Sequence, residues 1–568
     1  MAEADGPELK GRALLDELAH WTGIIGQAQQ LLIEYGATAA LKAIDGYTET
    51  LGKTLPNLAK SEEGADAGWG DALSFLQQMM PGSRGGAPDW QQPLFDLFHQ
   101  GHAILAQEVL GRIRDAELLD PRQREQLRFA TQAALDAMNP SNFALTNPRV
   151  VERIIETRGA NLVTGMQRML EDAAAGQIRH VDAHAFELGR NIAATPGKVI
   201  YENRLFQLLH YAPTTERVDA TPLLIFPPWI NRFYILDLGP KKSFVRWALD
   251  QGLSVFMVSW KSADAGLADV TMDDYVLGGE YEALSVVRRL LEVPSVHVVG
   301  YCVAGTALAM LLAWAAKTGR ADEIASATFF TAQVDFAQAG DLSLLVDDGQ
   351  MALIDALTSD GVLDGRYMSA TFNLLRGRDL IWNYVVNHYL LAEDYGAFDL
   401  LHWNSDVSNL PAEWHRRYLT DFYRDNLLAR PGAMSVGGES IDLGTVATPS
   451  YVQAGREDHI APAESVWKIT HHFKGPLRFV LAGSGHIAGV VNPPAANRYG
   501  YWTNDGKVET LAAFVEGATE HAGSWWPDWR AWITERSGGQ VAATGARLPG
   551  QGALAAIEDA PGRYVRTR

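Results

Sequence analysis

The 568-residue sequence predicts a parallel α/β domain preceded by a mostly helical N-terminal domain. Two observations support this class. From about residue 191, short β-rich runs alternate with segments of helical periodicity, which is typical of a parallel sheet covered by helices. Before that point, apolar clusters such as 31–33 and 94–98 fit one face of a helix, and β-branched runs are scarce. The apolar fraction of 47% is that of a globular protein with a large core.

We therefore assign residues 1–190 to the helical domain and 191–568 to the α/β domain. Within the first, residues 61–88 are rich in glycine, aspartate and serine, and we expect them to form a mobile linker. Residues 1–6 are polar and acidic, so no secretory signal is expected. The longest apolar run, 303–316, is too short for a membrane span and predicts a buried helix.

Charge and cysteine content restrict the functional classes. The net charge of −20 argues against general nucleic-acid binding. The single cysteine excludes an internal disulfide framework and a cysteine-based zinc site, and it indicates a reducing compartment. We therefore expect a cytoplasmic protein with no nucleic-acid partner.

The α/β domain contains six runs that are expected to form strands, namely 223–226, 254–260, 297–301, 326–331, 450–454 and 477–482. Helices are expected between them, as at 243–251, 273–291 and 303–317. About 120 residues separate the fourth strand from the fifth, and this segment is rich in Leu, Tyr, Trp and Asn. An insertion of that size predicts a cap over the active site, at about residues 337–445.

The only cysteine, Cys302, lies between the strand 297–301 and the helix 303–317. Free cysteines are often small buried hydrophobes, but a sharp strand-to-helix turn is the place of a nucleophile. A helix that begins at Val303 would favour the thiolate through its free N–H groups and its dipole. The usual motif has glycine two residues after the nucleophile, where this chain has Ala304.

A cysteine nucleophile requires a base and a group that orients the base. In an α/β-hydrolase fold they follow as acid and then histidine, each on a loop after a strand. Asp458 and His486 fit, at 156 residues after Cys302 and 28 residues after Asp458. Glu457 is a competing carboxylate and His459 a competing base. We favour His486 because its separate loop would let it contact the thiol and the acid together.

An oxyanion hole requires two N–H donors. Val303, directly after the nucleophile, would supply one. The second is expected from the loop after the strand 223–226, where Pro227 and Pro228 have no N–H to donate. Either Trp229 or Ile230 remains as the donor, and Ile230 is the residue that we select.

Several motifs resemble those of the polyhydroxyalkanoate synthases, specifically the class I type that polymerises short-chain monomers. They cover roughly residues 90–565 and are 186–201, 227–237, 300–303, 403–406, 409–411, 456–459, 485–489, 523–527 and 560–565. The chain departs from the family at Ala304-Gly305 and at Ser262-Ala263, where two glycines and Asn-Pro are common.

The resemblance implies an α/β-hydrolase fold with a large cap insertion, in which Cys302, Asp458 and His486 form a catalytic triad. It implies an acyltransferase that takes (R)-3-hydroxyacyl-CoA, such as 3-hydroxybutyryl-CoA, and releases CoA while a polyester grows. The family's proteins act as homodimers on intracellular polyester granules. No cofactor is expected, because CoA is part of the substrate and a product.

Some assignments stay open. Four arginines of the cap segment could bind the phosphates of CoA, namely Arg376, Arg378, Arg416 and Arg417. For any one of them, a solvated surface charge is the more common role. Asn231 and Tyr234 could shape the site, and Trp403 and Asp406 are interpreted as structural. Two other functions share these motifs: a cysteine-nucleophile α/β-hydrolase acting as an acyl-CoA thioesterase, and a non-enzymatic granule-coat protein.

Overall fold

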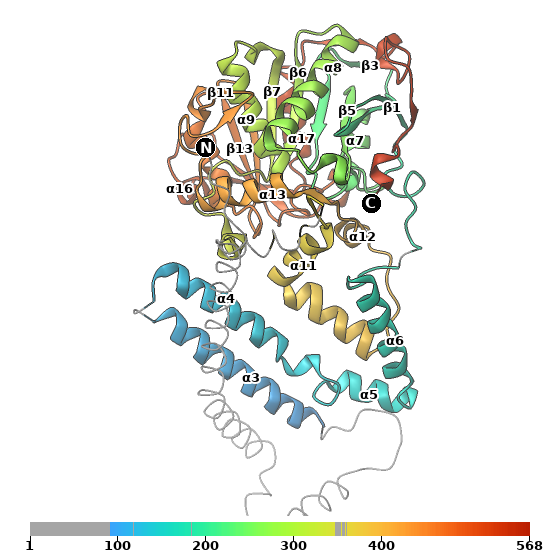
Figure 1. The fold of residues 1–568 in the computed structure, drawn as a ribbon, viewed down its shortest axis with the longest axis vertical. Coiled ribbons are helices and arrows are strands. Elements are labelled where there is room, and N and C mark those ends of the chain that lie inside the picture. The colour runs from blue at the N-terminus through green and yellow to red at the C-terminus, as the bar shows by residue number, and fades with distance from the viewer. Residues whose placement is uncertain are drawn as a thin grey trace, which may run out of the picture. The chain divides into compact units, whose positions relative to one another are not determined.

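The computed structural model describes residues 91–567, apart from 117–118, 183, 347–350, 352–353, 355–357 and 359. The described residues form two compact units (Figure 1). The α/β unit contains Val181–Ser369 and Ala397–Arg568, and the helical unit contains residues up to His180 together with Ala370–Gly396. The expected linker 61–88 and the helices before it lie outside the described residues.

The helical unit is built from α-helices and two π-helical segments. They are α3 Gln91–Arg114, α4 Pro121–Ala137, η2 Pro140–Asn142, α5 Pro148–Thr157, α6 Ala160–Ala175, η8 Arg378–Trp382 and η9 Val385–Leu390, while α11 Gly365–Leu375 crosses the boundary between the units. Helices α4 and α5 begin at the same signal, because Asp120 and Asn147 each cap a helix whose first residue is proline. The N-terminal region is therefore helical where it is described.

One large sheet organises the α/β unit, with strand order β15-β14-β13-β12-β7-β6-β4-β5-β2-β1-β17. Its strands are β1 Gly197–Glu202, β2 Phe206–Tyr211, β4 Leu223–Phe226, β5 Val255–Trp260, β6 Val296–Tyr301, β7 Ile324–Phe330, β12 Ser450–Gly455, β13 Leu477–Ala482, β14 Gly500–Thr503, β15 Thr519–Ala522 and β17 Glu558–Asp559. The six strands from β13 to β5 pair in parallel, and these are the six predicted strands. The strands outside them pair antiparallel.

The central strands are buried along almost their whole length because helices cover both faces of the sheet. Helices α7 Phe244–Asp250 and α17 Trp526–Thr534 share one face, where Phe244 contacts Trp526 and Trp529, each with ring centroids 5.1 Å apart. Alternate strand residues, such as Leu223 and Ile225, join that core. Helices α8 Glu282–Leu291 and α9 Val303–Lys317 contribute nothing to it and pack on β6.

The predicted helix 273–291 is present in two parts. Its first half is the π-helix η5 Asp274–Tyr281, and α8 continues from there. Gly279 lets η5 pack closely on Trp260 at the end of β5, because a β-carbon at position 279 would lie 2.8 Å from the Trp260 ring. Helix α7 and helix α9 lie where they were expected.

The segment between β7 and β12 contains short helices and two-stranded ribbons. In the α/β unit it includes η7 Gly340–Leu345, α12 Asp399–Ser405, α13 Ala412–Arg417, the π-helix η10 Tyr418–Arg424, η11 Leu443–Thr445, the β8 Val362–Leu363 and β9 Leu410–Pro411 pair, and the β10 Ser435–Val436 and β11 Glu439–Ser440 pair. Residues 370–396 from the middle of this segment belong to the helical unit.

The remaining short elements complete the α/β unit. They are β3 Arg217–Asp219, which pairs with β16 Gln540–Ala542, and η3 Phe233–Leu236, η4 Ala265–Leu267, η6 Ala321–Glu323, α14 Ala463–Trp467, α15 Ile469–His472, η12 Pro494–Ala496, α16 Leu511–Glu516, η13 Gly545–Arg547 and η14 Tyr564–Arg566. Among the described residues, none of the helices combines the length and the apolar character that crossing a bilayer requires.

Candidate active site

Cys302 occupies a strained turn between β6 and α9. Its backbone has φ 54° and ψ −125°, a conformation that L-residues rarely adopt outside tight functional turns. The turn is held because the Cys302 N–H donates to the carbonyl of Phe330 at 2.9 Å, while its own carbonyl accepts from the N–H groups of Gly305 and Thr306. The Thr306 hydroxyl also donates to the Gln333 carbonyl at 2.8 Å. The sulfur is half-buried at the carboxyl end of a central strand.

Two glycines let the strand and the helix approach each other at this turn. A β-carbon on Gly300 would lie 2.6 Å from the α-carbon of Gly305, and one on Gly305 would lie 2.4 Å from the β-carbon of Ala332. Ala304, where the usual motif has glycine, is fully buried. In this chain α9 therefore approaches β6 closely at Gly305, one residue after the usual glycine position. The turn can accommodate Ala304 because the close contact is not made there.

Asp458 and His486 lie on the loops that follow β12 and β13. The Nδ1 atom of His486 is 2.7 Å from Oδ2 of Asp458. The other carboxylate oxygen of Asp458 accepts the N–H groups of Ile460 and Ala461, each at 2.8 Å. The hydroxyl of Tyr301 donates to the carbonyl of His486 at 2.9 Å. Both ends of the pair are thus fixed by backbone contacts, and both side chains are buried.

The Cys302 sulfur lies near enough to the His486 ring to act on its charge, so the structure brings the three predicted side chains together. Burial disfavours the charged ring, but the charges of Asp458 and of the Cys302 sulfur, with the hydrogen bond to Asp458, outweigh it and raise the pKa of His486 to about 10. The imidazole therefore holds a proton at neutral pH. An imidazolium next to a thiolate is the reactive form of such a pair.

The competing residues lie differently. Glu457 is exposed to solvent, whereas Asp458 is buried and directed to His486. His459 follows Asp458 directly, but the ring that bonds to Oδ2 of Asp458 is that of His486. Helix α14 begins after Pro462, so Asp458 is not its cap.

The expected oxyanion donors are available for bonding. Within the described part of the chain, the N–H groups of Val303 and Ile230 donate to no other group. Val303 is the first residue of α9, and its N–H is one of the unpaired donors of a helix N-terminus. Ile230 lies in the loop after β4, and its carbonyl accepts from Ser408 at 3.2 Å. The Trp229 ring is buried and stacks on Tyr275, with centroids 4.0 Å apart.

Two buried tyrosines of the cap segment, which were not predicted, lie within reach of the charge of Cys302. Burial and the nearby charge of Cys302 raise the pKa of Tyr423 and also that of Tyr418. Both tyrosines belong to η10 and pack with Phe336, while Tyr418 stacks on Trp414 with centroids 5.1 Å apart. The only sequence signal was the aromatic enrichment of the cap segment.

The arginines that were considered for CoA are paired locally or exposed. Arg416 and Arg417 both bind Glu413, one turn earlier on α13. Arg376 binds Asp379 at 2.5 Å, and both Arg376 and Arg378 are exposed in the helical unit. These four residues therefore form no concentrated positive surface around the thiol.

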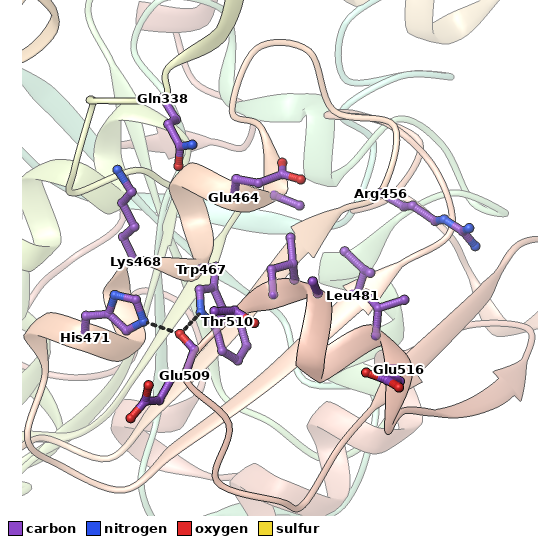
Figure 2. Close-up of a pocket in the computed structure, with 14 residues that line it drawn as sticks. Gln338, Arg456, Glu464, Trp467, Lys468, His471, Leu481, Glu509, Thr510 and Glu516 are labelled. Atoms are coloured by element: carbon purple, nitrogen blue, oxygen red, sulfur yellow. Dashed lines mark hydrogen bonds between the residues drawn. The ribbon is translucent and has the colours of Figure 1, made fainter.

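A cavity of about 760 Å³ lies beside the loop of Asp458 (Figure 2). Its lining includes Arg456 from the start of that loop, Leu481 from β13 and Trp467 from α14. The ring nitrogens of Trp467 and His471 both contact the carbonyl of Glu509, at 3.3 and 2.8 Å, and brace one wall. Cys302 is not among the residues that line this cavity, so the cavity does not contain the nucleophile. The candidate active site is therefore the turn at Cys302 and not this cavity.

Comparison with known proteins gives the family. Residues 82–248 match the family described as "Poly-beta-hydroxybutyrate polymerase (PhaC) N-terminus", and residues 229–493 match the α/β hydrolase fold. The chain is 44% identical over 486 residues to the "Poly(3-hydroxyalkanoate) polymerase subunit PhaC" of Rhizobium meliloti, which covers 84% of this chain and 79% of the relative. It is 42% identical over 485 residues to the protein of the same name from Cupriavidus necator, covering 84% and 82%.

The fold is therefore that of the α/β hydrolases, as the sequence predicted. Within that class, the chain belongs to the poly(3-hydroxyalkanoate) polymerase family, and it is an enzyme of the acyltransferase type.

Proposed function

We propose that this enzyme polymerises (R)-3-hydroxyacyl-CoA of short chain length, such as 3-hydroxybutyryl-CoA, and releases CoA, through a covalent thioester on Cys302. The observation that carries the proposal is the contact of Cys302 with His486, which Asp458 orients, in a chain of this family. The polymerase names of the relatives support the substrate class.

The first step is thioester exchange. His486 holds the proton of Cys302, and the thiolate attacks the carbonyl carbon of the acyl-CoA. The oxyanion that forms is stabilised by the N–H groups of Val303 and Ile230. The CoA sulfur then leaves with the proton from His486. One thioester replaces another, so the step is nearly balanced in free energy.

The second step forms the ester bond. The hydroxyl of an incoming 3-hydroxyacyl-CoA loses its proton to His486, and its oxygen attacks the thioester on Cys302. The chain moves to the incoming monomer, Cys302 leaves as the thiol, and the lengthened CoA thioester acylates Cys302 again. An oxoester replaces a thioester, so elongation is downhill. These steps use only groups of this chain, and CoA enters with the substrate.

Water competes with the hydroxyl for the acyl group on Cys302. The aromatic cover that contains Tyr418 and Tyr423 supports the proposal, because a cap that excludes water favours polymer over free acid. We also propose that the enzyme acts as a homodimer on polyester granules in the cytoplasm, as the resemblance implies.

The test is to supply 3-hydroxybutyryl-CoA and to measure free CoA, free acid and insoluble polyester. We expect CoA and polyester from the wild type and neither from Cys302→Ala. Cys302→Ser should lose most polymer output, because a serine ester removes the energetic gradient of the second step. CoA with free acid would instead identify a thioesterase, and no release of CoA would identify a binding protein.

A further inference from the structure

The loop that carries Ile230 is held by an unusual buried network. The hydroxyl of Tyr234 donates to Oδ2 of Asp406 at 2.7 Å, and Nε of Arg232 lies 3.4 Å from Oδ1 of the same carboxylate. The side chains of Arg232 and Asp406 are only 1% and 5% exposed. Burying an ion pair this deeply costs desolvation free energy and seldom adds net stability. The presence of the Arg232–Asp406 pair therefore requires an explanation other than stability.

The backbone contacts around this network indicate what it positions. Ser408 donates to the carbonyl of Ile230 at 3.2 Å, and Asn231 forms an antiparallel bridge with Val407. The indole N–H of Trp403 donates to the carbonyl of Arg232 at 2.6 Å. Segment 403–408 of the cap therefore binds the oxyanion loop at three successive residues, Ile230, Asn231 and Arg232.

A third element contacts the same loop. Nη2 of Arg232 donates to the carbonyl of Thr567 at 2.9 Å, which ties the guanidinium to the segment after η14. The loop after β4 is thus fixed from the cap and from the C-terminal segment together. Because neither contact uses the N–H of Ile230, that donor stays free for the substrate.

We propose that Asp406 is a positioning residue for the oxyanion hole, because it bridges Arg232 and Tyr234 and so fixes the loop that presents the Ile230 N–H. This inference rests on the proposed function, in which an oxyanion forms at the acyl carbon during both transfer steps. Loss of one oxyanion donor lowers turnover by about 10²–10³-fold, and a misplaced donor costs a part of that.

The test compares two reactions of the same cysteine. Acyl transfer from 3-hydroxybutyryl-CoA passes through an oxyanion, whereas alkylation by iodoacetamide requires only the thiolate. In Asp406→Asn we expect kcat for CoA release to fall about 10–100-fold, with KM and the alkylation rate of Cys302 within about 2-fold of the wild type. Since the chain contains one cysteine, alkylation reports on that residue alone.

The chain offers a matched control for a purely structural effect. Asp528 also joins a tyrosine hydroxyl and a guanidinium, from Tyr451 at 2.9 Å and Arg478 at 2.6 Å, and it contacts none of the site residues. Asp528→Asn should leave kcat within about 2-fold. If Asp406→Asn does not fold, Tyr234→Phe removes the 2.7 Å hydrogen bond to Asp406 and keeps the carboxylate, and it should lower kcat about 3–10-fold without slowing alkylation.

Three results would overturn the proposal: an unchanged kcat in both Asp406→Asn and Tyr234→Phe, an equal loss of kcat in Asp528→Asn, or a parallel loss of alkylation and acyl transfer. Failure of the proposed function is distinguished from all of these, because the wild type would then release no CoA or would yield only free acid.

Discussion

At the scale of single residues, the reactivity of this enzyme depends on where one proton resides. The Cys302 thiol, the His486 ring and the Asp458 carboxylate form a continuous chain of contacts. The raised pKa of His486 keeps its ring protonated beside the sulfur at neutral pH. The nucleophile is therefore prepared before the substrate binds, and the base needs no rearrangement to return the proton.

This arrangement predicts how the thiol reacts as a function of pH. In the wild type, iodoacetamide should alkylate Cys302 with a rate that changes little between pH 6 and 8, because His486 retains its proton until the pH approaches 10. In His486→Gln the thiol has no such partner, so its rate should rise with pH over this range and be at least about 10-fold lower at pH 6.5. Mass spectrometry of the alkylated protein measures both rates. Equal profiles for the two proteins would show that His486 does not hold the proton.

At the scale of elements, short contacts between strands, turns and helices explain several residues of the family motifs. Thr195, which precedes β1, donates its hydroxyl to Asp237 at 2.6 Å, and Ser243, the cap of α7, donates to the same carboxylate at 2.7 Å. Asp237 follows directly after η3, at the end of the loop that carries Ile230. One buried carboxylate thus joins three elements behind the oxyanion loop.

Stability should therefore depend on pH through Asp237. Burial outweighs its hydrogen bonds and raises the pKa of Asp237 to about 6. The folded-state pKa therefore lies above the unfolded value. Asp237 contributes about 3 kcal/mol to the free energy of unfolding below about pH 4, and this contribution is lost as the pH rises through 6. Asp237→Asn lacks this titration. The free energy of unfolding of the wild type, relative to the variant, should fall by about that amount between pH 4 and 7 in urea titrations. A constant difference across this range would contradict the assignment.

The turn at Cys302 depends on close packing of β6 against α9. A β-carbon at Gly305 would lie 2.4 Å from that of Ala332, so Gly305→Ala should destabilise the fold by about 1–3 kcal/mol and displace the thiol, with loss of most activity. Gly377 is the matched control, because a β-carbon there meets nothing within 4 Å in a helical backbone. Gly377→Ala should be neutral or slightly stabilising. Thermal unfolding and CoA release measure both effects, and equal behaviour of the two variants would refute the packing argument.

At the scale of the whole molecule, sequence patterns predicted the parts that local signals determine. The six parallel strands are apolar runs bounded by turn residues, and Cys302, Asp458 and His486 each follow one of those strands. The antiparallel strands β1 and β2, the π-helical geometry of η5 and the role of the η10 tyrosines were missed. Their formation depends on residues distant in the chain. Tyr423 packs on Phe336 and Tyr418 only through the folding of the cap segment, and the neighbours of Tyr423 in the sequence do not indicate this position.

The net charge of the whole chain, −20, has a consequence for an anionic substrate. CoA carries phosphate groups, so the field of the protein opposes their approach. Arg416 and Arg417 share the single negative charge of Glu413, and Arg376 is paired with Asp379, so the positive charge of these arginines is partly offset.

We therefore expect kcat/KM for 3-hydroxybutyryl-CoA to rise about 2–5-fold when the ionic strength increases from 0.01 to 0.15 M, because the screening length shortens from about 30 to 8 Å. The pantetheine thioester of the same acid lacks the phosphates and is the matched control; its kcat/KM should stay constant. Initial rates of thiol release measure both substrates. A fall in kcat/KM with salt for the CoA substrate alone would mean that a basic surface around the binding site outweighs the charge of the chain as a whole, since screening lowers kcat/KM only where substrate and site attract each other.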